Sequence, residues 1–134
     1  MKIRTFFSRY ELLFYTILRV VAGFLFLWHG SGKLFHYPDP GTAIPHYVVV
    51  IAGPIEFIGG ILIMTGLWTR LAAFLASGEM AYAYWFVHAG RSVLPIVNQG
   101  ELAVVYCFLF LFILFRGAGK YSLDHLIYHK KFFG

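Results

Sequence analysis

Long apolar runs that contain few charges are the feature that most constrains this chain. Four such runs occupy about residues 12–33, 47–67, 71–90 and 99–116. Each run is about 17–22 residues long, which is enough for a helix to cross a hydrocarbon core of roughly 30 Å. Charged residues make up only 13% of the chain, whereas a soluble domain has about twice that share. A soluble globular protein is therefore excluded.

The four runs predict an all-α fold, in which a single domain over residues 1–134 forms an integral membrane four-helix bundle. The lysines and arginines predict its orientation, because eight of them flank the ends that would share one side of the membrane. The other side has only Lys33, at the end of the first run, and Arg91. Both termini should therefore be cytoplasmic. Residues 117–134 should form a cytoplasmic tail with a short surface helix, which Ser122 or Asp124 would cap.

The net charge of +5 is a topology signal rather than a binding patch, because the basic residues sit at the termini and singly between the runs. We therefore expect the lipid bilayer as the main partner and no nucleic acid. The single cysteine, Cys107, excludes an intrachain disulfide and thiol–disulfide exchange by this chain alone. No metal site is expected.

Away from their ends, the predicted spans contain three charged residues, and each costs several kcal/mol there. Counted from the cytoplasmic end, Arg19, Glu79 and Glu56 lie at depths of about 10, 12 and 16 Å. We expect Arg19 to pair with one carboxylate, while the other is protonated or finds a polar partner. Two interpretations stay open, because this polar cluster could lock the packing of the helices or handle protons or a quinone.

A second polar set is predicted nearer the outer face. His29 and His88 lie at equal depth, Glu101 lies close to that level, and Lys33 follows His29 by one helical turn. These groups could bind the headgroup of a quinone or another polar ligand, or they could simply cap a helix interface. Paired histidines also ligate haem, but we see no glycines placed to make room for one, and we do not expect it.

Small and polar residues mark the faces on which the first two helices should meet. Such residues recur at helical spacing in both runs: Arg19, Gly23, Phe26, Gly30 and Lys33 in the first, and Gly53, Glu56 and Gly60 in the second. Small residues let helices approach closely, and polar residues must face the interior. Gly53-Pro54 should also kink the second helix just before Glu56.

Short motifs along nearly the whole chain resemble those of the DoxX family. They read Leu18-Arg19, Trp28-His29-Gly30-x-x-Lys33-Leu34, Ile55-Glu56-x-x-Gly59-Gly60, Gly66-Leu67-x-Thr69-Arg70, Ala76-Ser77-Gly78-Glu79-Met80-Ala81, Asn98-x-Gly100-Glu101-x-Ala103 and Gly117-x-Gly119-x-x-Ser122-x-Asp124. The resemblance implies a multi-pass protein of the bacterial inner (plasma) membrane. Some members of that family are associated with quinone-linked oxidation of sulfur compounds, and others look like anchors for soluble enzymes.

The leading hypothesis is a membrane subunit that supports quinone-linked redox metabolism, with a partner protein supplying the redox centre. Glu56 and Glu79 would be its catalytic proton-exchanging groups, and Arg19 would hold one of them ionised. The ligand-binding residues would be His29, Lys33, His88 and Glu101. The alternatives are a non-catalytic anchor or assembly subunit and a transporter of protons or small solutes. The cofactor, the substrate, the partner and a homo-oligomeric state stay open.

Overall fold

All regular structure in the described part of the chain is helical. The computed structural model describes residues 2–133, with side chains over residues 7–128, and no strand occurs within it. The elements are α1 (Lys2–Phe35), α2 (His46–Thr65), α3 (Thr69–Tyr82), the π-helix η1 (Ala83–His88), α4 (Pro95–Asn98), α5 (Glu101–Arg116) and α6 (Leu123–Phe133). The all-α prediction is confirmed, and each predicted apolar run coincides with helical structure.

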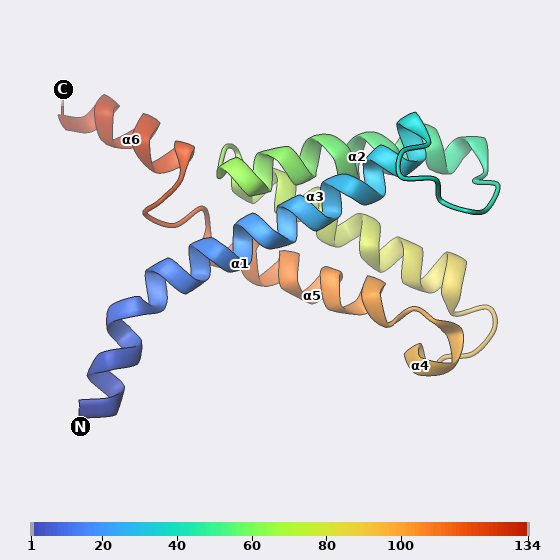
Figure 1. Ribbon diagram of the computed structural model, residues 1–134, viewed down its shortest axis with the longest axis horizontal. Coiled ribbons are helices and arrows are strands. Elements are labelled where there is room, and N and C mark those ends of the chain that lie inside the picture. The colour runs from blue at the N-terminus through green and yellow to red at the C-terminus, as the bar shows by residue number, and fades with distance from the viewer. Residues whose placement is uncertain (1, 134) are drawn as a thin grey trace.

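The helices form two packed pairs that are joined side by side. α1 lies against α2, α3 lies against α5, and α2 contacts α3 between the pairs (Figure 1). Aromatic rings close the other side of the bundle, where Phe26 of α1 contacts Tyr106 and Phe110 of α5 at ring-centroid distances of 5.6 and 4.6 Å. The interior between the pairs is therefore packed over one part of its length by aromatic side chains.

Glycines bring the backbones of α1 and α2 into direct contact. A Cβ atom added to Gly23 would lie 2.6 Å from the carbonyl oxygen of Gly60, and one added to Gly60 would lie 2.7 Å from that of Gly23. A Cβ at Gly30 would overlap the backbone of Phe57 in the same way. The prediction that these two glycine-bearing faces meet is confirmed. Pro54 lies inside α2, as the sequence placed it.

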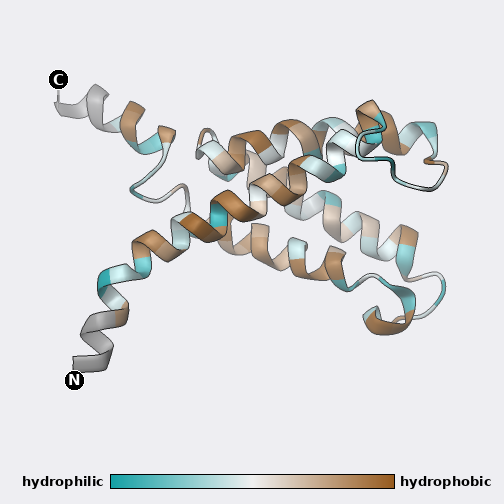
Figure 2. Cartoon of the chain, viewed as in Figure 1, coloured by the Kyte–Doolittle hydropathy of each residue, from teal (hydrophilic) through white to brown (hydrophobic). Residues whose placement is uncertain are grey.

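The outer surface of the bundle is apolar. Large side chains such as Phe74, Val105 and Phe108 are mostly exposed, and apolar residues dominate the helices of the bundle in Figure 2. Two helical stretches, Phe7–Phe35 and His46–Thr65, are long and apolar enough to cross a membrane. Such an apolar surface is stable when lipid surrounds it. Four spans and cytoplasmic termini stay predictions.

The two ends of the chain lie at the same end of the bundle, opposite α4 (Figure 1). α1 begins at Lys2, earlier than the predicted run, and its first turns extend away from the other helices. The predicted short helix of the tail is confirmed as α6. Ser122 caps it, since its Oγ accepts a hydrogen bond of 3.2 Å from the backbone N–H of His125.

Asp124 has a different role from the one that the sequence indicated. Its carboxylate accepts hydrogen bonds from the backbone N–H groups of Trp68 (2.8 Å) and Thr69 (3.0 Å), where α3 begins. The backbone N–H of Asp124 donates in turn to the carbonyl oxygen of Gly66, at 2.8 Å. The tail therefore supplies the cap of α3 and is fixed to the turn between α2 and α3.

Candidate functional site

An ion pair between α1 and α2 lies in the interior of the bundle. Glu56 is 2% exposed, and Lys33 Nζ lies 2.5 Å from its Oε2 atom. Lys33 stands in the last turn of α1 and reaches back toward Glu56, because helical side chains lean toward the N-terminus of their helix. A buried carboxylate needs such a partner, since an unpaired charge away from water is costly. Lys33 is therefore the counter-charge of Glu56.

Glu79 of α3 brings a second carboxyl group to this pair. Glu56 and Glu79 line one cavity of the bundle together with Lys33. The Oε2 atom of Glu79 is buried and has no hydrogen-bond partner among the described residues. Lys33 balances one carboxylate, so the three groups together are neutral when the two carboxyls hold one proton. We call Lys33, Glu56 and Glu79 the carboxyl cluster.

A cavity of about 280 Å³ adjoins the carboxyl cluster, and we call it the inner cavity. Polar groups from five helical elements and from the connection after α4 line it: His29, Lys33, Glu56, Glu79, His88, Gln99 and Tyr106. The ring of His29 meets the ring of Tyr106 edge-on, with centroids 6.0 Å apart. The inner cavity thus joins apolar walls to several convergent polar groups, which is typical of a site for a small molecule.

The π-helix η1 and the loop after it hold His88 in the inner cavity. The backbone N–H of Ala89 donates to the carbonyl oxygen of Tyr84, five residues back, at 2.8 Å. His88 Nδ1 lies 3.2 Å from the carbonyl oxygen of Asn98. Asn98 is itself buried, and its side chain is hydrogen-bonded to the backbone of Ser92 and Gly100. Irregular turns of this kind frequently re-aim side chains at functional sites.

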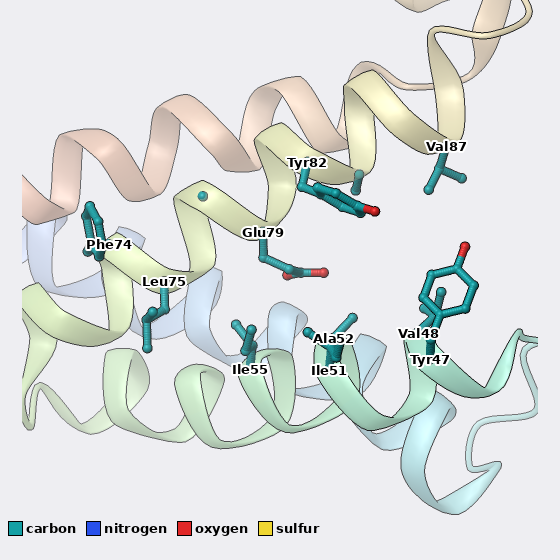
Figure 3. A pocket seen from close by; sticks show the side chains of 12 residues that line it. Tyr47, Val48, Ile51, Ala52, Ile55, Phe74, Leu75, Glu79, Tyr82 and Val87 are labelled. Atoms are coloured by element: carbon teal, nitrogen blue, oxygen red, sulfur yellow. The ribbon is translucent and has the colours of Figure 1, made fainter.

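A second hollow, of about 480 Å³, lies between α2 and α3, and we call it the apolar cleft (Figure 3). Aliphatic and aromatic side chains line most of it, among them Ile51, Ile55 and Phe74. Ile51 and Phe74 are 60% and 61% exposed, so the cleft opens on the apolar surface of the bundle. Figure 3 shows the carboxyl group of Glu79 pointing into the space between the two helices. Glu79 lines both the apolar cleft and the inner cavity.

The expected pairing of Arg19 with a carboxylate is wrong. Arg19 is 1% exposed, but its Nη1 atom donates to the carbonyl oxygens of Ile63 (2.7 Å) and Met64 (3.2 Å), and Nη2 donates to that of Tyr121 (2.7 Å). It therefore caps the C-terminal end of α2, where a cation is favoured. Fourteen positions separate it from Lys33 on α1, which is about 21 Å of helix.

The structure brings together five of the seven site residues that the sequence indicated. These are His29, Lys33, Glu56, Glu79 and His88, whereas Arg19 lies at the other end of the bundle and Glu101 is exposed in the first turn of α5. Tyr106, which is 5% exposed and lines the inner cavity, was not predicted as a site residue. The sequence marks this residue in one way: its hydroxyl group stands in the middle of an apolar run, away from the membrane–water interfaces where tyrosine is common.

Comparison with known proteins places these features in a family. The family model for DoxX matches residues 14–89, a range that contains α2 and α3 and both carboxyl groups. A protein of Haemophilus influenzae, named as uncharacterized, is 42% identical over 130 residues, which cover 92% of this chain and 97% of the relative. The inner membrane protein YqjF of Escherichia coli is 26% identical over 121 residues, covering 85% and 92%. No solved structure matches. The chain belongs to the DoxX family of membrane proteins.

Proposed function

We propose that this protein binds a membrane quinone with its headgroup at the carboxyl cluster and exchanges protons with it, as a subunit of a quinone-linked redox system. The observation that carries the proposal is the position of Glu79, which lines both the apolar cleft and the inner cavity. A quinone combines an apolar tail with two carbonyl oxygens. It therefore needs a lipid-accessible apolar path that ends at hydrogen-bonding groups.

The contacts of Glu79 support its role as the group that meets the headgroup. Its Oε2 atom is buried and has no hydrogen-bond partner within residues 7–128, whereas Glu56 is held by Lys33 at 2.5 Å. An unmade hydrogen bond at a buried oxygen costs about 1–3 kcal/mol, which a ligand that supplies the partner recovers. Of the two carboxyls, Glu79 is thus the one that gains most from a bound headgroup.

Reduction of a quinone to a quinol takes up two electrons and two protons. The electrons would come from a partner redox protein, because this chain offers a single cysteine and no dithiol. The protons would come from the carboxyl cluster, and water at the mouth of the inner cavity would replace them. His29 supports this route, since it lines the cavity and is exposed at its edge. Histidine is suited to passing protons near neutral pH.

The proposal places the protein in the bacterial inner membrane with four spans and cytoplasmic termini. α1 and α2 have the length and hydropathy of spans, and α3 continues without a break through η1, so that Thr69–His88 is about 30 Å long at 1.5 Å per residue. α5 has 16 residues and lies along α3. The relative YqjF is named an inner membrane protein, which supports the same compartment.

The test is quinone retention by the purified protein in nanodiscs that contain ubiquinone or menaquinone. The native chain should retain one of the two, quantified by mass spectrometry after washing, and Glu79→Gln should retain about tenfold less, the loss that 1.4 kcal/mol corresponds to. Glu101→Gln makes the same chemical change at an exposed carboxylate outside the cavity and should behave as the native chain. Equal retention by all three proteins, or none by the native chain, would overturn the proposal.

Two further functions have a specific observation in their favour. The first turns of α1 extend beyond the bundle (Figure 1), which suits an anchor for a soluble enzyme. An anchor would recover its partner equally well with Glu79→Gln, and deletion of the protein would leave quinone reduction in membranes unchanged. The position of Glu79 between two hollows also suits a proton or solute transporter. Proteoliposomes that dissipate a pH gradient without any quinone would favour that function.

A further inference from the structure

A polar recess lies at the end of the bundle opposite the inner cavity. It has a volume of about 580 Å³ and is formed where α3 begins, α5 ends and α6 begins, with Arg70, Arg116, Ala118 and Asp124 among its lining residues. We call it the tail recess. It shares no lining residue with the inner cavity or the apolar cleft. Whatever binds there would do so independently of the proposed quinone site.

The walls of the tail recess are fixed by hydrogen bonds across the chain. Asp124 is bonded to the start of α3 through both carboxylate oxygens, as described above. Tyr15 of α1 donates its hydroxyl hydrogen to the carbonyl oxygen of Gly117, at 2.5 Å. Arg19 donates a hydrogen bond to the carbonyl oxygen of Tyr121. The segment between α5 and α6 is therefore tied to α1 and α3, and the recess is a built feature of the fold.

Arg70 presents unused donors to this recess. Its Nη1 atom donates to the carbonyl oxygens of Leu114 (2.7 Å) and Phe115 (3.3 Å) at the end of α5. The guanidinium group packs beside Gly117, where an added Cβ would lie 3.0 Å from Nη2 and 3.3 Å from Nε. Among the residues with described side chains, none accepts a hydrogen bond from Nη2 or Nε. The bonds of Nη1 thus orient the Arg70 side chain, and its Nη2 and Nε atoms remain available to donate hydrogen bonds to a ligand.

Arg116 adds a second guanidinium group to the same recess. Its Nη2 atom forms an ion pair of 2.7 Å with Glu11, and its Cζ atom lies 5.2 Å from the ring centroid of Tyr15. The lining side chains include two arginines and only one carboxylate, that of Asp124, whose oxygens are turned toward the backbone N–H groups at the start of α3. The described part of the recess therefore carries more positive than negative charge.

We propose that the tail recess binds a phosphate-type oxyanion through Arg70 and Arg116. The planar fork of arginine matches the oxygens of a phosphate group and can bind two of them at once. The rim of the recess includes Trp68 and Tyr128, which are 64% and 60% exposed. Such aromatic residues are typical of the level of lipid headgroups. The same chemistry is found in an anionic lipid headgroup and in a soluble phosphate.

The test measures lipids bound to the purified full-length protein by native mass spectrometry, after reconstitution in phosphatidylcholine with phosphatidylglycerol. The native chain should retain phosphatidylglycerol at least tenfold more than Arg70→Gln or Arg116→Gln. Because Arg70 also holds the end of α5, a second variant, Ala118→Glu, keeps both arginines and places a competing carboxylate in the recess. It should lose the bound lipid as well.

Arg91→Gln is the matched control, since it removes one exposed arginine at the opposite end of the bundle. It should retain phosphatidylglycerol as the native chain does. Inorganic phosphate at millimolar concentration distinguishes the two sources: competition with the lipid indicates a site for soluble phosphate as well, and no competition indicates a headgroup site. Native retention in Arg70→Gln and Ala118→Glu, or an equal loss in Arg91→Gln, would overturn the proposal. Quinone retention in the same samples reports separately on the carboxyl cluster.

Discussion

The ammonium group of Lys33 on α1 lies 2.5 Å from the carboxylate of Glu56 on α2. A lysine near the end of an apolar helix commonly extends its side chain outward to the membrane interface. Here the side chain turns inward, because Glu56 is 2% exposed and needs a counter-charge. The charge of Glu56 is thus balanced from within the bundle by Lys33.

Removing the counter-charge should destabilise the bundle strongly. Lys33→Met should lower the free energy of unfolding by about 3–5 kcal/mol, because it leaves Glu56 buried without a cation. The double variant Lys33→Met/Glu56→Gln should recover most of that loss. Thermal unfolding in one detergent measures both, with Lys120→Met, an exposed lysine of the tail, as the control. A double variant no more stable than Lys33→Met would contradict the pairing.

The glycine contact between α1 and α2 makes a second prediction. A Cβ at Gly60 would lie 2.6 Å from the backbone nitrogen of Leu27, so Gly60→Ala must push the helices apart. We expect a loss of about 1–3 kcal/mol, as for other overpacked interiors. Gly59→Ala is the control on the same helix, because a Cβ there meets no atom within 4 Å. Its melting temperature in detergent should equal or exceed that of the native chain, and a fall as large as that of Gly60→Ala would contradict the interpretation.

Loss of Arg19 should release the tail without emptying the quinone site. Arg19→Gln removes charged hydrogen bonds to Ile63 and Tyr121, each worth about 1.5–3 kcal/mol. Hydrogen exchange should therefore speed up at the end of α2 and in the segment after α5. Quinone retention should stay at the native level, since Arg19 is remote from the carboxyl cluster. Arg9→Gln, an exposed arginine of α1, should change neither measurement.

Removal of the cap that Asp124 provides should loosen the start of α3. Asp124→Ala should cost about 0.5–2 kcal/mol, the usual loss at a helix cap, since the N–H groups of Trp68 and Thr69 lose their acceptor. Thermal unfolding and amide exchange at these two residues check the effect. Asp39→Ala changes an exposed aspartate in the loop between α1 and α2 and should leave α3 unaffected. Unchanged exchange at Thr69 in Asp124→Ala would show that the cap contributes nothing.

Much of the fold follows from the sequence, because the bilayer imposes simple rules on it. Long apolar runs must be helical there, since each backbone polar group needs a partner within its own segment. The glycines at Gly23 and Gly60 stand on the faces that meet because no larger residue permits that approach. Lys33 was placed on the same face of the first helix, and His88 was placed at the depth of His29; both line the inner cavity.

The pairing of the charges could not be predicted from depth alone. Counting from the predicted ends set Arg19 level with the carboxyls, but α1 crosses α2 so that Arg19 meets the last carbonyls of α2. A charged side chain can also be satisfied by backbone oxygens, which the sequence does not mark. Tyr106 was missed for a related reason, since its level depends on how α5 lies against α1.

The bond from Arg19 to Tyr121 joins residues 102 positions apart. During translation the first helix leaves the ribosome and reaches the translocon long before Tyr121 has been added to the chain. The Nη1 atom of Arg19 can donate to Ile63 and Met64 as soon as α2 has been made, but Nη2 must stay with water or lipid phosphates until the tail has been added. A ribosome that stalls before residue 121 would therefore release a chain whose first two helices are joined by Arg19 but whose Nη2 atom lacks its acceptor.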